Sequence, residues 1–305
     1  MEKYYIQSPF ITNEIIRISS LIIDEGFAEL KERELDDNII VHNLRKRVKN
    51  LRALLRLIRK ELGEDAFKKN NFMLRDLNRR SAALRNVFAL ITITGSMQQQ
   101  NTNGDLIEPY NLLLSRLTND FETIKSKTEL SSLFNNYQDT LEKYNLRIIH
   151  MDFDKQSFRN IKAGLQIIYY GCVNSLQNSL GTKDENLLHE WRKNVKDLYY
   201  CCLSLTPLWK PVISVYTKEL KVLSDLLGDL HDLFELQIYI QSLTDNPFDF
   251  TGIFQIIEQM QDNIISNSVP LGKRLFAEDE EQFAQRIKSY YAAYRKEYKQ
   301  QNKKP

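Results

Sequence analysis

The chain has 305 residues, of which 42% are hydrophobic and 27% charged, a composition typical of a folded globular protein. Its formal net charge of +2 excludes a function that depends on the bulk charge of the molecule, so an anion site must come from local clusters of cations. There is no signal-peptide layout, and no apolar run approaches the ~20 residues of a membrane span. We therefore expect a cytoplasmic protein that does not bind membranes.

The helical periodicity of the apolar residues predicts ten helices. They cover residues 12–33, 38–61, 65–100, 106–125, 128–146, 157–180, 186–206, 212–243, 250–265 and 278–300. The predicted breaks are a capping segment at Asp36-Asp37-Asn38, a turn over 101–105, a connector over 147–156, a break at Asp245-Asn246-Pro247 and a loop that bears Pro270 and Gly272.

Glycine (10 residues) and proline (7 residues) are scarce, and no polar–apolar alternation is long enough to build a sheet. We therefore predict an all-α fold of two four-helix bundles in a single domain that spans residues 1–305. Residues 12–146 are expected to form the first helical repeat and residues 157–298 the second. The cysteines lack the spacing of zinc ligands and are expected to be small core side chains: Cys172, Cys201 and Cys202.

One basic helical motif occurs twice, 147 residues apart. The copies are His42-Asn43-Leu44-Arg45-Lys46-Arg47-Val48-Lys49-Asn50-Leu51 and His189-Glu190-Trp191-Arg192-Lys193-Asn194-Val195-Lys196-Asp197-Leu198. A second pair of segments has an offset of 146: Ala82-Ala83-Leu84-Arg85-Asn86 and Gly228-Asp229-Leu230-His231-Asp232. Repeats at a fixed offset predict two similar structural units, which we expect to be related by a pseudo-two-fold axis.

Each motif helix has an apolar stripe and a basic stripe at 100° per residue. The apolar stripes contain Leu44, Val48, Leu51, Leu55 and Ile58 in the first copy and Trp191, Val195, Leu198, Cys202 and Leu205 in the second. The basic stripes contain His42, Arg45, Lys46, Lys49, Arg52, Arg56 and Lys60 in the first copy and His189, Arg192, Lys193 and Lys196 in the second. No acidic residue interrupts the first basic stripe, although like charges at this spacing repel. The uncompensated charge predicts an anionic ligand.

These motifs, together with Leu227-Gly228-Asp229-Leu230-His231-Asp232, resemble the CHAD family, the conserved histidine α-helical domain, over residues 12–298. The resemblance implies two four-helix bundles about a pseudo-two-fold axis, a basic groove between them, and binding of inorganic polyphosphate. It places these residues on groove-lining positions: His42, Arg45, Lys46, Lys49, Arg52, His189, Arg192, Lys193 and Lys196. The pair Arg85-Asn86 departs from the Arg-Asp usual in the first repeat of the family, and we find no domain of the triphosphate-tunnel type.

We expect non-catalytic binding of polyphosphate, free or in granules, or of a similar polyanion. The expected site consists of those nine residues and Arg56, Arg85 and His231. No cofactor, metal, catalytic residue or specific nucleic acid is predicted. Polyphosphate carries roughly one negative charge per phosphate, so lysine and arginine side chains at one-turn spacing, about 5.4 Å, can meet successive phosphates.

Other functions stay open at this point. In a scaffold role, the basic groove would hold the acidic tail of a protein partner. A phosphate-chain-processing enzyme would need a metal, which Asp225, Asp229 and Asp232 could hold at one-turn spacing, although no G-x-x-x-x-G-K-[ST] phosphate loop is present. A nucleic-acid-binding protein would stack bases on Tyr199 and Tyr200.

The histidines also have several possible roles. His42 and His189 would be neutral donors to phosphate, cations, or partners in capping or inter-helix hydrogen bonds. His231 beside Asp232 would be either a structural contact or an acid–base pair.

Overall fold

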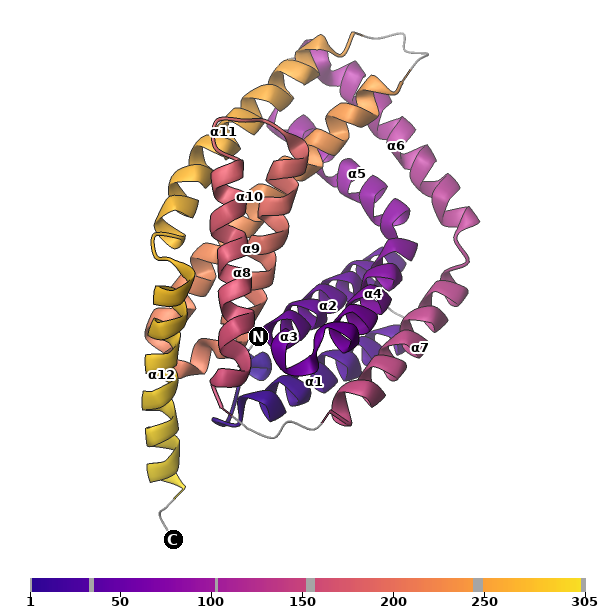
Figure 1. Ribbon diagram of the computed structural model, residues 1–305. Coiled ribbons are helices and arrows are strands. Elements are labelled where there is room, and N and C mark those ends of the chain that lie inside the picture. Colours follow the sequence, from indigo (N-terminus) through magenta and orange to yellow (C-terminus); the bar gives the residue numbers. More distant parts are fainter. Residues whose placement is uncertain (1, 33–35, 102–103, 152–156, 244–248, 303–305) are drawn as a thin grey trace.

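The computed structural model describes residues 2–32, 36–101, 104–151, 157–243 and 249–302. Within these ranges the chain forms twelve α-helices, three 3₁₀ helices and no strand, which confirms the all-α prediction (Figure 1). The α-helices are α1 (Ile11–Lys31), α2 (Asp37–Leu57), α3 (Arg59–Leu62), α4 (Glu64–Arg80), α5 (Ala82–Gln100), α6 (Ile107–Lys127), α7 (Leu130–Ile149), α8 (Arg159–Asn178), α9 (Glu185–Leu205), α10 (Lys210–Gln241), α11 (Thr251–Leu275) and α12 (Glu280–Gln301). The 3₁₀ helices are η1 (Glu2–Tyr4), η2 (Gly104–Leu106) and η3 (Thr206–Leu208).

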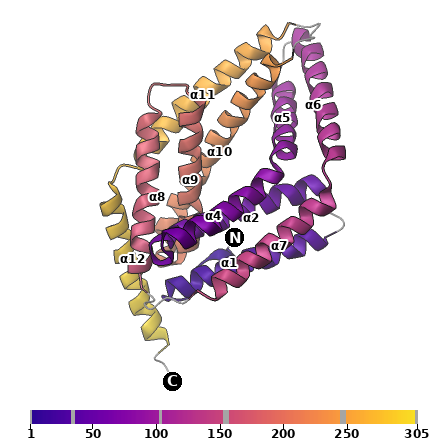
Figure 2. The ribbon, with the colours of Figure 1, turned by 45° about the vertical axis from the view of Figure 1, so that its right-hand side comes forward.

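The helices form two groups that meet along α2 and α9. Helices α1, α2, α4 and α7 pack as a ring in which each helix contacts two others. In the second group, α8 packs against α9 and α12, and α9 packs against α10. The α5–α6 pair extends away from the first ring, and α5 packs against α10 at a second junction (Figures 1 and 2). The pseudo-two-fold axis between the groups stays a prediction.

The two motif helices are α2 and α9, and each has 21 residues. Each begins after a capping aspartate: Asp36 accepts a hydrogen bond of 2.7 Å from the N–H of Asn38, and Asp184 one of 3.0 Å from the N–H of Leu187. The ten side chains of the predicted apolar stripes are at most 2% exposed. Burial of one stripe on each helix turns the basic stripe toward the opposite side.

Small residues let the two groups approach closely where α2 meets α8 and α9. Gly164 of α8 lies against the end of α2, where a Cβ atom would overlap the carbonyl oxygen of Leu57. The Sγ of Cys201 in α9 donates a hydrogen bond of 3.6 Å to the carbonyl oxygen of Ala53 in α2. Like the other two cysteines, Cys201 is buried with a free thiol, as predicted. The close approach fixes α2 directly against α9.

The helix predicted over residues 65–100 is two helices, α4 and α5, which meet at Ser81. The Ser81 side chain is buried, and its hydroxyl lies 3.0 Å from the hydroxyl of Tyr137. The same hydroxyl accepts a hydrogen bond of 3.2 Å from Nη1 of Arg45. Both partners are distant in the sequence, so the local periodicity could not reveal this break.

The predicted loop around Pro270 and Gly272 is wrong, because α11 continues through both residues to Leu275. Proline inside a helix removes one backbone hydrogen bond. Packing offsets this loss: Gly272 is buried against Trp191, where a Cβ atom would lie 2.6 Å from Cζ2 of the indole.

Other predicted breaks fall partly or wholly outside the described residues. The predicted break at 245–247 lies wholly outside them, as do residues 102–103 of the predicted turn and 152–156 of the predicted connector. No helix within the described ranges combines the length and apolar character needed to cross a membrane.

Candidate functional site

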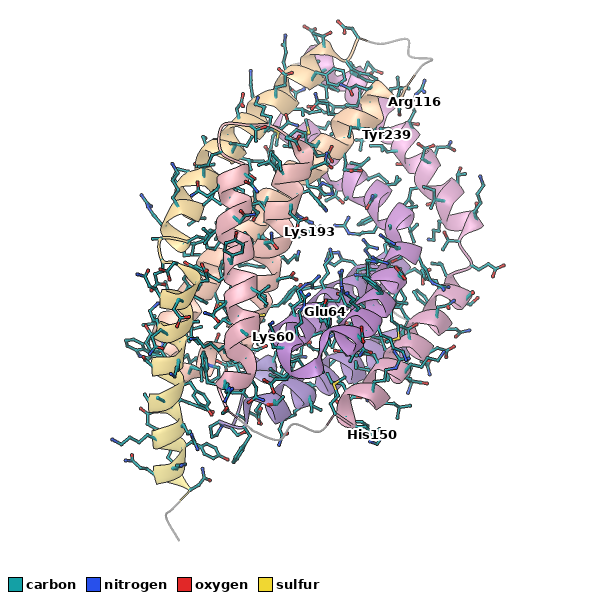
Figure 3. All side chains as sticks on the ribbon, in the orientation of Figure 1. Lys60, Glu64, Arg116, His150, Lys193 and Tyr239 are labelled. Atoms are coloured by element: carbon teal, nitrogen blue, oxygen red, sulfur yellow. The ribbon has the colours of Figure 1, made fainter. Side chains whose placement is uncertain are left out.

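Three adjoining pockets lie between helices α2, α4 and α5 on one side and α9 and α10 on the other. Lys49 and Arg192 line all three, and the largest pocket has a volume of about 560 Å³. We call the residues that line these pockets the basic site. It includes all twelve predicted binding residues: His42, Arg45, Lys46, Lys49, Arg52, Arg56, Arg85, His189, Arg192, Lys193, Lys196 and His231. Figure 3 places Lys193 on the side of α9 that faces α4 and α5.

Lys49, Arg192 and Lys196 form the electrostatic centre of the basic site. In the part of the chain that the structure describes, none of them has a carboxylate oxygen within 4.0 Å. Burial and the charge of Arg192 lower the pKa of Lys196 to about 8. Burial and the charge of Lys196 lower the pKa of Lys49 well below its usual range. These three cations repel one another, and a bound anion would relieve that repulsion.

Arg45 also has a structural role, which its place in the motif does not reveal. Its Nη1 donates hydrogen bonds to the carbonyl oxygen of Asn78 and, at 3.2 Å, to Oγ of Ser81. The Nδ2 of Asn78 donates a hydrogen bond of 3.2 Å back to the carbonyl oxygen of Arg45. Arg45 therefore ties α2 to the end of α4. Its Nε and Nη2 have no hydrogen-bond partner among the described residues, so the same guanidinium can also meet a ligand oxygen.

Two of the predicted cations are paired with acids at one end of the basic site. Nη1 of Arg56 donates a hydrogen bond of 3.3 Å to Oδ1 of Asp197, and Nζ of Lys193 lies 2.5 Å from Oε2 of Glu190. Burial raises the pKa of Asp197, while the charge of Arg56 acts in the opposite direction. This end is therefore less attractive to an anion than the centre.

The three predicted histidines are neutral at pH 7. Burial and neighbouring positive charges lower the pKa of His42 and of His189 to about 4. Burial lowers the pKa of His231 to about 3, and the neighbouring His189 acts in the same direction. Nδ1 of His42 accepts a hydrogen bond of 3.3 Å from Nε of Arg85, which leaves the imidazole proton on Nε2. Of the roles open to these histidines, the geometry favours the neutral imidazole.

Helix α4 contributes two arginines that were not among the predicted binding residues. Arg75 and Arg79 line the largest pocket, and both pair with Asp76, at 3.0 and 3.4 Å. At the same wall, Nε of Arg52 donates a hydrogen bond of 3.0 Å to Oδ1 of Asn71. The sequence signals for these arginines are their spacing of one helical turn and, for Arg75, its place in the segment Leu74-Arg75-Asp76-Leu77, which leads into the second repeated segment. The basic motif itself does not contain them.

Helix α10 contributes one further cation and several acids. Lys221 pairs with Asp225 at the edge of one pocket. Asp232 and Glu235 line the largest pocket, and burial raises the pKa of both carboxyls. The basic site therefore has one partly acidic wall.

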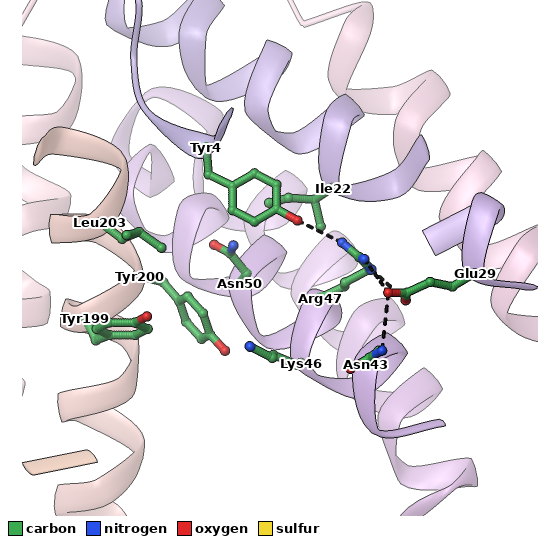
Figure 4. Close-up of a pocket in the computed structure, with 10 residues that line it drawn as sticks. All are labelled: Tyr4, Ile22, Glu29, Asn43, Lys46, Arg47, Asn50, Tyr199, Tyr200 and Leu203. Atoms are coloured by element: carbon green, nitrogen blue, oxygen red, sulfur yellow. Dashed lines mark hydrogen bonds and ion pairs between the residues drawn. The ribbon is translucent and has the colours of Figure 1, made fainter. Parts of the chain in front are cut away.

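A fourth pocket, of about 220 Å³, lies beside the basic site (Figure 4). Arg47, the remaining arginine of the first motif, lines this pocket and forms two ion pairs. Its Nη1 lies 2.6 Å from Oε2 of Glu25, and its Nη2 lies 2.6 Å from Oε1 of Glu29, so its charge is neutralised. Tyr199 and Tyr200 line this pocket and the basic site, and both side chains are buried. Buried rings offer little surface for base stacking, so the geometry does not favour nucleic-acid binding.

One group of side chains has the geometry of metal ligands. Among the described residues, Glu185, His231 and Glu235 are the only set of three whose ligand atoms all lie within 4.8 Å of one another. The three aspartates of α10 that were considered as a metal site do not form such a set. Nδ1 of the neutral His231 lies 3.8 Å from Oε1 of Glu185.

Comparison with known families gives one match. The profile of the CHAD domain matches residues 22–241, which include both motif helices and all twelve predicted binding residues. No curated protein matches the chain.

Proposed function

The chain belongs to the CHAD domain family, and on this premise we propose that it binds inorganic polyphosphate, or a similar polyanion, in the basic site without degrading it. One observation carries this proposal. Lys49 of α2 and Arg192 and Lys196 of α9 converge, and in the described residues no carboxylate lies within 4.0 Å of them. Cations held together in this way are unfavourable until an anion binds between them.

The chemistry of the side chains suits a phosphate chain. The guanidinium groups of Arg45 and Arg192 can each donate two hydrogen bonds to a phosphate, whereas the lysines act as mobile point charges. The neutral histidines can donate from one ring nitrogen without adding to the repulsion. A polymer without bases or sugars needs only such charge and hydrogen-bond contacts.

Titration with polyphosphate of defined length, at about 50 and 200 mM salt, tests the proposal. We expect saturable binding that weakens on the order of 100-fold between these concentrations, because bound counterions are released. Lys49→Met together with Lys196→Met is expected to weaken binding strongly. Lys127→Met, at the exposed end of α6, is the matched control and should bind like the wild type. Equal losses in the two variants would contradict a convergent site.

The same experiment addresses the other functions. Polymer length measured after incubation distinguishes binding from hydrolysis, since shortened chains would support an enzyme. Failure to bind polyphosphate at low salt, with retention of an acidic peptide, would support the scaffold role instead.

A further inference from the structure

The fourth pocket, drawn in Figure 4, has a counterpart within the basic site. Four residues of the first motif line the fourth pocket, and the residues 147 positions later all line the pocket that contains Arg52 and Arg56. The four pairs of equivalent residues are Asn43 and Glu190, Lys46 and Lys193, Arg47 and Asn194, and Asn50 and Asp197. The repeat therefore places one such pocket on each motif helix.

The two equivalent pockets differ in charge. In the pocket of the basic site, Nη1 of Arg56 donates a hydrogen bond of 3.3 Å to Oδ1 of Asp197. The residues equivalent to this pair are Leu203 and Asn50, and both line the fourth pocket. A neutral amide and an apolar side chain therefore stand in the fourth pocket where its counterpart has an ion pair.

The amide of Asn50 has unused hydrogen-bonding capacity. The residue is only 4% exposed, and its Oδ1 is buried without a hydrogen-bond partner. Its Nδ2 forms no hydrogen bond within the described residues either. Figure 4 shows the amide among the side chains of Tyr4, Tyr200 and Leu203. A buried amide without partners is unfavourable, and a ligand that presents a donor and an acceptor side by side would satisfy it.

We propose that the fourth pocket binds the adenine ring of a nucleoside polyphosphate, such as ATP, whose phosphates lie in the basic site. Adenine presents an amino donor next to a ring-nitrogen acceptor, and an asparagine amide pairs with both. The pocket volume of about 220 Å³ is below the about 300–1,000 Å³ of pockets that enclose a drug-sized ligand, so it suits one planar ring system. Because Glu25 and Glu29 neutralise Arg47, the pocket favours an uncharged group.

Lys46 connects the fourth pocket to the phosphate contacts of the basic site, and this step rests on the proposed function. Lys46 lines both the fourth pocket and the pocket that contains Lys49 and Lys196. Asn50 lies one turn after Lys46 on α2, about 6 Å along the helix axis. A ligand with phosphates beside Lys46 can therefore place its base at Asn50. A single enclosed base does not need the exposed ring faces on which a nucleic acid stacks successive bases.

Calorimetric titration with ATP, GTP and inorganic tripolyphosphate, in EDTA and at about 50 mM salt, tests the proposal. Tripolyphosphate has phosphates but no base, so it measures the phosphate contacts alone. We expect ATP to bind about tenfold more tightly than GTP, because the corresponding edge of guanine has two acceptors and no donor. Equal affinity for ATP and GTP would overturn the proposal.

Two variants locate the base contact. Asn50→Leu keeps the size of the side chain but removes the amide, so it should weaken ATP binding about tenfold and leave tripolyphosphate binding unchanged. Leu203→Phe, which fills the pocket from α9, should have the same effect. Asn267→Leu, on the exposed face of α11, is the control and should bind all three ligands like the wild type. Melting temperatures establish that each protein is folded. An unchanged preference for ATP over GTP in folded Asn50→Leu would overturn the base contact.

Adenosine, which has the base but no phosphate, separates this proposal from the proposed function. Saturation transfer from the protein to adenosine, measured by nuclear magnetic resonance, should occur in the wild type and be lost in Asn50→Leu. If tripolyphosphate bound but ATP were not preferred over GTP, the base pocket would fail and the proposed function would stand. If neither tripolyphosphate nor polyphosphate bound at low salt, the proposed function would fail. The adenosine measurement would then decide the base pocket, and absence of transfer in the wild type would overturn it.

Discussion

Nε of Arg85 donates a hydrogen bond of 3.3 Å to Nδ1 of His42 and so connects α5 to α2 on one side of the basic site. His231 lies 146 residues after Arg85, and His189 lies 147 residues after His42. The ring centroids of these two histidines are 4.4 Å apart, so they connect α10 to α9. Matching positions of the repeated motifs are thus in contact in both halves. Their chemistry differs, because the first pair includes a guanidinium and the second consists of two neutral imidazoles. The first half therefore provides the more basic side of the site.

The low pKa of His189 predicts a loss of stability at acid pH. Its pKa is about 4 in the folded protein against an ordinary value of 6.5, so the unfolded chain takes up the proton first as the pH falls. The free energy of unfolding should therefore decrease from pH 6.5 toward pH 4. His189→Gln should remove about 1 kcal/mol of this decrease, allowing for solvent screening. Chemical denaturation at pH 7.5 and 4.5 measures the difference, with His150→Gln, at the exposed end of α7, as control. The same pH dependence in wild type and His189→Gln would contradict the prediction.

Removal of a central lysine should stabilise the protein and weaken binding. The pKa of Lys196 is about 8 in the folded protein against an ordinary 10.5, so protonation favours the unfolded chain between these values. As the pH falls from 10.5 to 8, the wild type should lose stability relative to Lys196→Met, and below pH 8 the difference should be constant, at about 1 kcal/mol. Urea unfolding at pH 10.5 and 7.5 measures this difference. A variant that is less stable than the wild type at pH 7.5 would show that the ammonium is not under strain.

Arg45 and Arg192 occupy the same position in the two copies of the motif, but their truncation to alanine should affect stability differently. Arg45→Ala removes the donor for the carbonyl oxygen of Asn78 and for Ser81, so we expect a loss of about 1–3 kcal/mol in stability. Arg192 has no such hydrogen bonds among the described residues, and Arg192→Ala should change stability by no more than about 0.5 kcal/mol. Under the proposed function, each variant should bind polyphosphate about tenfold more weakly. Thermal unfolding and polyphosphate titration of both variants check these values, and equal destabilisation would contradict the structural role of Arg45.

The contact between α8 and the end of α2 should not tolerate a larger residue. Gly164→Ala places a methyl group against the carbonyl oxygen of Leu57, which belongs to a backbone that cannot rotate away. We expect a loss of about 1–3 kcal/mol or more in the free energy of unfolding. Gly95→Ala, in α5, meets nothing within 4 Å and should instead stabilise the protein by about 0.5–1 kcal/mol. Urea denaturation of both variants checks the two signs, and an unchanged stability of Gly164→Ala would show that the helices can separate there.

Short-range pattern and its repetition were sufficient to predict the motif helices and the cations that they contribute to the basic site, but not those of α4 and α10. The register of Lys49 on α2 follows from the burial of Leu44, Val48 and Leu51, because the helical period then fixes which residues lie opposite. The convergence of α2 with α9 followed from the repetition of the motif. In both cases the information lies within one helix or in its repeat.

Features that depend on distant partners could not be predicted in this way. Ser81 ends α4 because Tyr137 and Arg45 are near in space, and α11 continues through Pro270 because tertiary packing outweighs the lost hydrogen bond. The proximity of Glu185 to His231 likewise depends on the relative position of α9 and α10, which no local period specifies. The sequence therefore predicted the helix content of the protein but not these contacts between helices.

The concentration of cations in one place also affects how the molecule meets a ligand. The lysines and arginines of the basic site exceed its carboxylates by more than the +2 of the whole chain, so the remaining surface has a net negative charge. The protein is therefore an electric dipole whose positive end is the basic site. In the field of a long polyanion it will rotate before contact, so that encounters begin at the basic site and other faces are repelled. Such orientation is weakened by salt, and association should therefore slow as the ionic strength rises.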